Sequence, residues 1–389
     1  MNPPKYILPT IVIAQFFCTS LWFAGNGVLV QLIADYNLGV NSLGNITSAV
    51  QFGFITGTLL FAVLTLTDRF SPSKVFLVSA VLGALSNLGI VLDGSGWTMI
   101  LTSRFLTGFF LAGIYPVGMK IAADYYDKGL GKSLGYLVGA LVVGTALPHF
   151  LKWWAAVFPW QYVIYSISVL SIIGGLLMFL LVPDGPFRKP SQRLDLTACF
   201  AVFKKRDFRA AAFGYFGHMW ELYTFWAFVP FLLGLHMELN SINSLPVSFW
   251  SFWIIAIGGL ACVLGGYISL RKGAKITAAI ALGLSGLCCL LSPVLLSYAS
   301  TPVFILFLLF WGMVVIADSP LFSTLVAKNA PVEIKGTALT IVNCIGFAIT
   351  ILSLQLLNHL QAVVSPNYLF VILALGPAIG LWNLFKKQS

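Results

Sequence analysis

Charged side chains are scarce in this sequence. Asp, Glu, Lys and Arg make up only 9% of its 389 residues, whereas 59% are hydrophobic. The mean hydropathy of +0.94 is far higher than a soluble core of this size requires. The apolar runs approach the roughly 20 residues that a membrane-spanning helix needs and exceed the roughly 10 of a barrel strand. These features exclude a soluble protein and predict an all-α membrane protein.

Sequence motifs for nucleotide and metal chemistry are also missing. The full phosphate-binding pattern G-x-x-x-x-G-K-[ST] does not occur, which argues against an ATP-driven pump. The zinc motif H-E-x-x-H and paired Cys-x-x-Cys are absent as well, so we expect no enzyme, no metal site and no cofactor. The remaining energy source is an ion gradient, with a proton or sodium as the coupling ion.

The apolar runs predict about twelve transmembrane helices, each about 20 residues long. We expect them at 8–33, 43–66, 75–93, 98–125, 131–152, 160–182, 209–235, 246–270, 275–297, 302–328, 336–358 and 367–385.

The basic residues indicate the orientation of these helices. Of the 22 Lys and Arg, all but Arg104 and Lys152 fall on one side of the predicted membrane. The positive-inside rule assigns that side to the cytoplasm, so both termini are expected there. The net charge of +10 is then a topology signal and an attraction to anionic membrane lipid, and no nucleic acid is expected as a partner. Short loops indicate a multi-pass protein of a bacterial inner membrane that works as a monomer.

The chain divides into two related halves. A basic, proline-containing linker at 183–208 separates residues 1–182 from 209–389, with six predicted helices in each part. Gly108 and Pro116 in the fourth span have the same spacing as Gly312 and Pro320 in the tenth. An internal repeat of this kind is typical of secondary transporters, whose binding site lies near the membrane midplane.

Two further motifs carry a family resemblance. The turn LTDRFSPSKV after the second span contains Asp68, Arg69 and Lys74, and RFLTG in the fourth span contains Arg104. The sequence thereby resembles the major facilitator superfamily of secondary transporters over essentially its whole length. The resemblance implies twelve helices in two pseudo-symmetric six-helix halves that work by alternating access. It also implies a coupling role for Arg104, as in several proton-driven members.

A cytoplasmic gate is expected at the inner turn. Asp68 can lie against the N-terminus of a neighbouring helix, whose unpaired N–H groups favour an anion. Arg69 and Lys74 can pair with Asp124 or Asp127 at the end of the fourth span, although Asp127 lies outside the residues that the structure describes. Such a cluster would hold the inner face closed in the outward-open state. The alternative is that these are solvated charges at helix ends.

Acidic residues inside the predicted spans are the candidates for proton coupling. His218 and Glu221 lie three residues apart in the seventh span, on one helix face. Glu221 falls about 18 Å from the inner end, near the bilayer centre, where an acid must be protonated, paired or facing water. Asp318 in the tenth span precedes Pro320, which frees a backbone carbonyl. The alternative for each acid is a structural hydrogen bond, and His218 can simply orient Glu221.

Basic and aromatic residues are the candidates for the substrate cavity. Arg104 can bind a substrate anion or an acidic side chain, or extend outward as an anchor. Lys120 can line the cavity or pair with Asp124 four residues later. Further candidates are Tyr115, Trp22, Asn26, Tyr223 and Trp226.

These features favour a proton-coupled secondary transporter of a small polar solute, and the two basic residues favour an anionic or zwitterionic one. Two alternatives remain. A glycine-proline pattern from Gly135 to Pro148, together with the aromatic content, suggests a proton-driven antiporter that exports drugs or other lipophilic compounds. A non-transporting receptor on the same fold would tolerate neutralisation of Glu221 and Asp318.

Overall fold

The structure is a computed structural model that describes residues 4–39, 41–92, 94, 96–126, 130–188 and 202–386. Within these ranges the regular elements are all helices. Eleven of them are long and apolar enough to cross a membrane, and the N-terminal helix Ile7–Thr19 is apolar but shorter. The expected all-α membrane fold is therefore confirmed.

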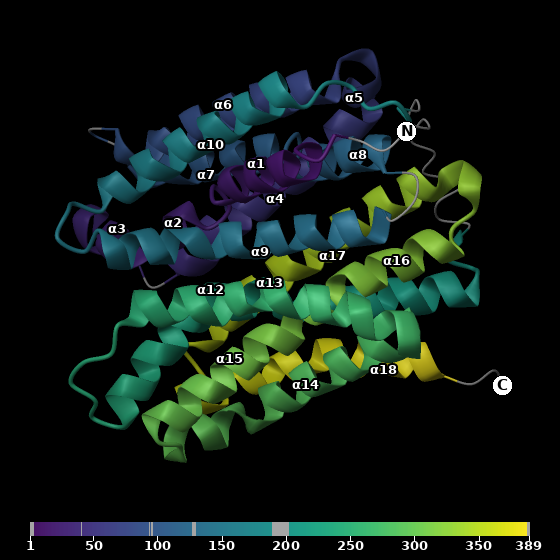
Figure 1. Cartoon of the computed structure of the whole chain (residues 1–389). Coiled ribbons are helices and arrows are strands. Elements are labelled where there is room, and N and C mark those ends of the chain that lie inside the picture. Colours follow the sequence, from purple (N-terminus) through teal and green to yellow (C-terminus); the bar gives the residue numbers. More distant parts are fainter. Residues whose placement is uncertain are drawn as a thin grey trace. The chain divides into compact units, whose positions relative to one another are not determined.

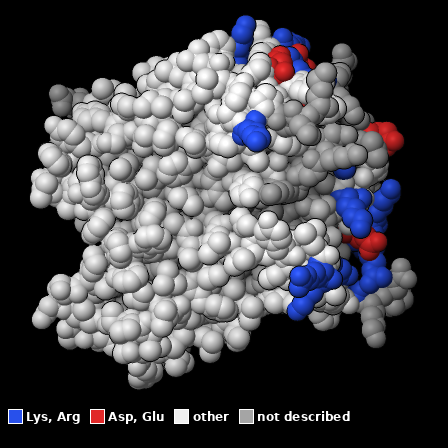
Figure 2. Space-filling view, in the orientation of Figure 1, with Lys and Arg blue, Asp and Glu red and all other residues white. Residues whose placement is uncertain are grey.

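The chain forms two compact units, Met1–Arg193 and Leu194–Ser389 (Figure 1). The division falls inside the linker expected at 183–208, of which residues 189–201 lie outside the described ranges. In each unit taken by itself, the Lys, Arg, Asp and Glu side chains gather mainly at one end (Figure 2). This is the end of α5 and α8 in the N-terminal unit and of α16 and α18 in the C-terminal unit.

The N-terminal unit begins with three short helices, where the sequence predicted one span over 8–33. The chain leaves the helix at residues 20–23 and again at Val28, and the Gly25-Asn26-Gly27 segment between them, which has low helix propensity, forms only a single turn. The helices of this unit are α1 (Ile7–Thr19), α2 (Ala24–Gly27), α3 (Leu29–Tyr36), α4 (Ser42–Val63), α5 (Leu66–Arg69), α6 (Pro72–Leu88), the 3₁₀ turn η1 (Gly89–Val91), α7 (Trp97–Leu111), α8 (Tyr115–Tyr125), α9 (Leu130–Trp154) and α10 (Gln161–Leu181).

The first membrane-spanning helix described in the C-terminal unit is different, because it runs for 34 residues and continues through Pro230. Its last span combines a 3₁₀ segment with an α-helix. The elements are α12 (Arg206–Leu239), α13 (Val247–Lys272), α14 (Ala274–Tyr298), α15 (Thr301–Ala317), α16 (Ser319–Asn329), η2 (Val332–Ile334), α17 (Lys335–Leu360), η3 (Pro366–Ala374) and α18 (Leu375–Phe385).

The repeat seen in the sequence is also visible in the packing. A Cβ atom at Gly108 would collide with the carbonyl oxygen of Val50, and one at Gly312 would collide with that of Ile254. The same number of residues separates Gly108 from Gly312 and Val50 from Ile254. Glycine is therefore required at this position in both units, because it lets α7 approach α4 and α15 approach α13 closely.

The fourth membrane span of each unit is broken into two helices at an equivalent place. α7 ends at Leu111 and α8 starts at Tyr115, just before Pro116. α15 ends at Ala317 and α16 starts at Ser319, just before Pro320. Proline has no N–H and cannot continue the hydrogen-bond ladder of the preceding helix. The two breaks leave polar backbone groups deep in each unit, where neighbouring side chains can reach them.

Candidate functional site

Glu221 lies at the centre of a polar cluster inside the C-terminal unit. It is on α12, and only 1% of its surface is exposed. Trp311 Nε1 of α15 donates to Oε1 at 2.6 Å, and Ser285 Oγ of α14 donates to Oε2 at 2.7 Å. Cys289 Sγ, one helical turn after Ser285, donates to Oε1 at 3.3 Å. Each carboxyl oxygen therefore has at least one donor from a neighbouring helix.

His218, one turn before Glu221, pairs with the other buried acid. Its Nδ1 lies 2.8 Å from Oδ1 of Asp318, and both side chains are 1% exposed. Asp318 occupies the junction between α15 and α16. The structure thus places His218 against Asp318, while Glu221 is held by side chains from α14 and α15.

The charge environment of Glu221 and Asp318 bears on whether they can exchange a proton. Among the described residues, no Lys or Arg forms a salt bridge with Glu221 or Asp318. An isolated charge in such a place is costly unless it is neutralised by a proton or held by hydrogen bonds. Glu221 is held by neutral donors, and Asp318 is held by a histidine that carries charge only when protonated. The cluster can therefore gain or lose a proton without an oppositely charged Lys or Arg fixing its state.

Arg104 is the buried cation of the N-terminal unit. It lies on α7 with no exposed surface. Its Nη1 donates to Asn87 Oδ1 at 3.0 Å, and its Nη2 donates to the carbonyl oxygens of Leu21 and Trp22 at 2.9 and 2.7 Å. Those two carbonyls lie where the chain is broken between α1 and α2. The guanidinium therefore binds backbone carbonyls at the break, of which the Leu21 carbonyl also accepts from the Ala24 N–H at 3.4 Å, and it does not extend outward as an anchor.

The remaining cavity candidates form two groups, one in each unit. Asn26 Nδ2 donates to Thr47 Oγ1 at 2.8 Å. The Trp22 ring packs on Phe54, with the ring centroids 4.8 Å apart. In the C-terminal unit, Tyr223 and Trp226 are buried on α12, with ring centroids 5.3 Å apart. Tyr115, at the first position of α8, is half-buried.

The expected cytoplasmic gate has a different pairing from the one anticipated. Asp68 pairs with Lys120, with Oδ1 and Nζ 3.9 Å apart, and Lys120 also interacts electrostatically with Asp124, four residues later on α8. Arg69 at the end of α5 and Lys74 in α6 are exposed, and among the described residues neither forms an ion pair with Asp124. The physical reason is burial: Asp124 is only 6% exposed, whereas the two basic side chains are in contact with solvent.

Several participants were missed from the sequence. Arg188 Nη2 donates to the carbonyl oxygens of Thr67, Asp68 and Phe70, which fixes the inner turn. Ser285 and Cys289 are four residues apart, a spacing that places them on one face of a helix and could have signalled a shared partner. Trp311 precedes Gly312, the glycine of the internal repeat, and no sequence pattern indicated that it contacts Glu221.

One nucleophile motif of the sequence is not found in its usual structural setting. The pentapeptide Gly131–Gly135 has the spacing G-x-S-x-G, but it lies in the first turns of α9 and not at a strand-to-helix turn, where this motif acts as a nucleophile elbow. In the described part of the chain, no group of three or more His, Cys, Asp or Glu is arranged to hold a metal ion.

Comparisons with known proteins identify the fold and the family. A family model described as Major Facilitator Superfamily matches residues 11–354. The niacin transporter NiaP of Acinetobacter baylyi is 29% identical over 168 residues, which cover 37% of this chain and 37% of that protein. The multidrug resistance protein MdtL of Salmonella heidelberg is 28% identical over 173 residues, 43% of this chain and 42% of that protein. The matched segment thus spans less than half of the length of these curated relatives.

Solved structures of low sequence identity share the fold. A D-xylose-proton symporter superposes with a TM-score of 0.78 at 16% identity, over 98% of this chain and 97% of that one. The human organic anion transporter MFSD10 gives a TM-score of 0.72 at 16% identity, over 98% of this chain and 100% of that one.

Proposed function

Because this chain belongs to the Major Facilitator Superfamily, we propose that it is a proton-coupled secondary transporter that moves a small polar solute by alternating access. It is a multi-pass membrane protein and not an enzyme. The proposal places it in a bacterial inner membrane as a monomer with both termini in the cytoplasm. The coupling ion is a proton, with sodium as the alternative.

One observation carries the proton-coupling proposal: Glu221 and Asp318 are both buried in the C-terminal unit without a Lys or Arg salt bridge among the described residues. Ionisable groups at membrane depth are costly and usually mark ion or substrate pathways. His218 gives Asp318 a partner whose own charge depends on its protonation. A proton taken up from one side can therefore change the net charge of this cluster.

The solute is proposed to be anionic or zwitterionic. The similarity to a niacin transporter supports a small polar molecule. A substrate anion would compete with the present acceptors of Arg104, which are the Asn87 side chain and two backbone carbonyls, and with Asp68 for Lys120. Such an exchange would couple binding to a rearrangement at the break between α1 and α2.

Export of lipophilic compounds is the second candidate. The similarity to multidrug resistance proteins covers slightly more of the chain than the similarity to the niacin transporter. The buried aromatic pair Tyr223 and Trp226 offers the apolar surface that such a compound would need. Export against a proton gradient is antiport, so the direction of the proton flux separates it from symport.

The test is a proton-flux measurement in liposomes that contain the purified protein and a pH-sensitive dye. Nicotinate and ethidium serve as the polar and lipophilic probes. We expect a probe-dependent proton flux in the wild type that is lost in Glu221→Gln or Asp318→Asn. Glu238→Gln is the matched control, because it makes the same change at the exposed end of the same helix and should leave the flux unchanged.

The direction of the proton flux distinguishes symport from drug export. Inward proton flux with nicotinate uptake supports symport, and outward ethidium movement against inward protons supports drug export. Probe movement without proton flux, or a flux that both acid variants retain, would overturn the coupling proposal and leave the two acids as structural or sodium-binding groups.

A further inference from the structure

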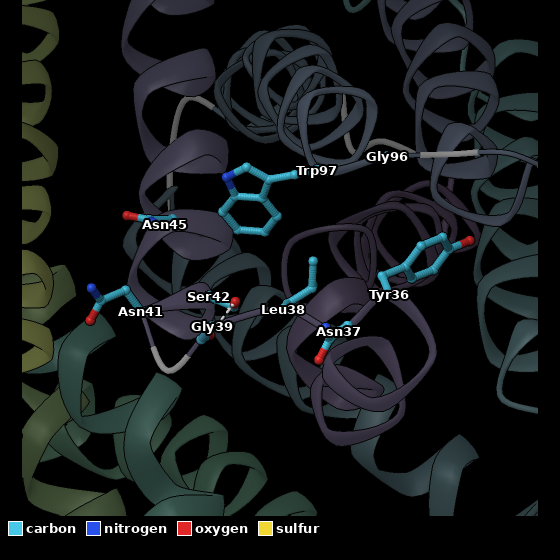
Figure 3. Close-up of a pocket in the computed structure, with 9 residues that line it drawn as sticks. All are labelled: Tyr36, Asn37, Leu38, Gly39, Asn41, Ser42, Asn45, Gly96 and Trp97. Atoms are coloured by element: carbon cyan, nitrogen blue, oxygen red, sulfur yellow. Dashed lines mark hydrogen bonds between the residues drawn. The ribbon is translucent and has the colours of Figure 1, made fainter.

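A pocket of about 430 Å³ opens at one end of the N-terminal unit, away from the residues discussed so far (Figure 3). It is formed by the loop from α3 to α4, the first turn of α4 and the start of α7. Its volume falls within the range of about 300–1,000 Å³ that is usual for small-molecule sites. We call it the amide pocket, after Asn37, Asn41 and Asn45 in its lining.

The lining is polar but uncharged. Its nine described residues include three asparagines, a serine, a tyrosine and a tryptophan, and none is Asp, Glu, Lys, Arg or His. An asparagine amide both donates and accepts hydrogen bonds, as a hydroxyl group does. Figure 3 shows the indole of Trp97 extending from α7 towards the loop that carries Leu38 and Ser42. The pocket thus combines a flat apolar surface with amides around it.

The walls of the amide pocket are fixed by contacts within the unit. Asn37 ends α3 in the left-handed conformation, with φ of 48°, which turns the chain sharply into the loop. Ser42 Oγ donates to the Gly39 carbonyl at 2.5 Å and so closes that loop. Tyr36 Oη donates to the Ile90 carbonyl at 3.1 Å, which ties the end of α3 to η1. A pocket with fixed walls loses little entropy when a ligand binds.

The position of the pocket separates it from the charged end of the same unit. It lies at the N-terminus of α4, and Asp68 lies beyond the C-terminus of that helix. At about 1.5 Å per residue, the 22 residues of α4 extend about 33 Å, enough to cross the hydrocarbon core. The pocket therefore faces the aqueous phase or the lipid headgroups on the side opposite the Asp68–Lys120 pair.

We propose that the amide pocket binds an uncharged, hydroxyl-rich ring, either a free sugar or the sugar headgroup of a glycolipid. The apolar face of such a ring packs on the Trp97 indole, and its hydroxyls bond to the asparagine amides. The described lining residues include no group of opposite charge that could replace the water of a charged ring. This site is additional to the transport function and independent of proton coupling.

The test is saturation-transfer difference NMR on the full chain in lipid nanodiscs. Methyl β-D-glucoside is the neutral probe, glucuronate the negative one and glucosamine the positive one. We expect transfer chiefly to the glucoside, reduced at least about fivefold by Trp97→Leu, since aromatic contacts of this kind are worth about 1 kcal/mol or more. Trp154→Leu is the matched control, because it removes an indole that is 72% exposed and does not line the pocket.

A second variant tests the charge preference of the pocket, and a second membrane composition tests whether the ligand is a lipid headgroup. Asn45→Asp places a carboxylate in the lining and should shift the preference towards glucosamine. Nanodiscs that contain monoglucosyl diacylglycerol should suppress transfer to the free glucoside if the headgroup is the ligand, and leave it intact if the ligand is a free sugar. Transfer no greater than in empty nanodiscs, equal transfer to all three probes, or a signal that Trp97→Leu leaves unchanged would overturn the proposal. Because no proton gradient is used, these outcomes are separate from the liposome test.

Discussion

In the N-terminal unit the charged side chain with no exposed surface is the guanidinium of Arg104, and Asp124 is 6% exposed, whereas in the C-terminal unit the buried ionisable groups include the carboxyls of Glu221 and Asp318. The means of support differ as well. Arg104 donates to two backbone carbonyls and one side-chain amide, while Glu221 accepts from three side chains. Two units built on one repeat thus hold groups of opposite charge by different means.

The difference can be traced to the first helix of each unit. In the N-terminal unit the chain is broken between α1 and α2, and the freed carbonyls are acceptors that suit a cation. In the C-terminal unit α12 is continuous, and the donors come from side chains on α14 and α15. The residue four positions before the repeat glycine follows the same division: it is Arg104 before Gly108 and Leu308 before Gly312.

The sharpest test of this comparison is Arg104→Leu, which gives the N-terminal unit the residue of its repeat partner. Asn87 Oδ1 and the Trp22 carbonyl lose the guanidinium donor, and the Leu21 carbonyl retains only the 3.4 Å bond from the Ala24 N–H, so the free energy of unfolding should fall by about 4 kcal/mol. The measurement is equilibrium unfolding in mixed micelles of SDS and dodecyl maltoside. Leu308→Met, a conservative change at the equivalent position, is the control. Unchanged stability in Arg104→Leu would show that the break in the first span does not depend on the guanidinium.

The next largest effect is expected for His218→Leu. It leaves Asp318 buried without its partner, and the free energy of unfolding should fall by about 3 kcal/mol. The double variant His218→Leu with Asp318→Leu removes both groups and should recover most of that loss, to within about 1 kcal/mol of the wild type. If the two losses simply add in the double variant, the pair is not energetically coupled.

A smaller effect is expected for Trp311→Phe. The substitution removes the N–H that donates to Glu221 but retains an aromatic ring to stack on Phe225, whose centroid is 4.4 Å from that of Trp311. The unfolding free energy should fall by about 1–2 kcal/mol, as for the loss of one hydrogen bond to a buried carboxyl. Ser285→Ala, which removes the donor to the other carboxyl oxygen, should give a similar value. A neutral result for both would mean that Glu221 does not need these donors.

The smallest effect is expected at the Asp68–Lys120 pair. The two side chains are 17% and 20% exposed and 3.9 Å apart, so solvent screens their attraction. Lys120→Met should lower the unfolding free energy by less than about 1 kcal/mol. Lys74→Met, which removes an exposed lysine from the same end of the unit, should change it even less. A loss above about 2 kcal/mol in Lys120→Met would show that this pair is a major support of the N-terminal unit.

The fold was largely predictable, whereas the partners of the candidate residues were not. Apolar runs and basic loops depend on local composition, so they indicated helices and their approximate ends. The break in the first span was not anticipated over 8–33, because it involves Arg104, about eighty residues further along the chain. For the same reason the pairing of Lys120 with Asp68 was not anticipated, because the sequence indicated only Asp124, its neighbour on the same helix.

Local composition is enough to establish that this protein is a membrane-embedded helical bundle with an internal repeat. An apolar segment in lipid must satisfy its backbone N–H and C=O groups internally, and a helix does so within one segment. The polar contacts depend instead on tertiary packing: Arg104 meets the carbonyls of Leu21 and Trp22, Asp318 meets His218, and Glu221 meets Trp311. Those pairings depend on how the helices rotate and approach one another, and only close packing at residues such as Gly108 and Gly312 fixes that geometry.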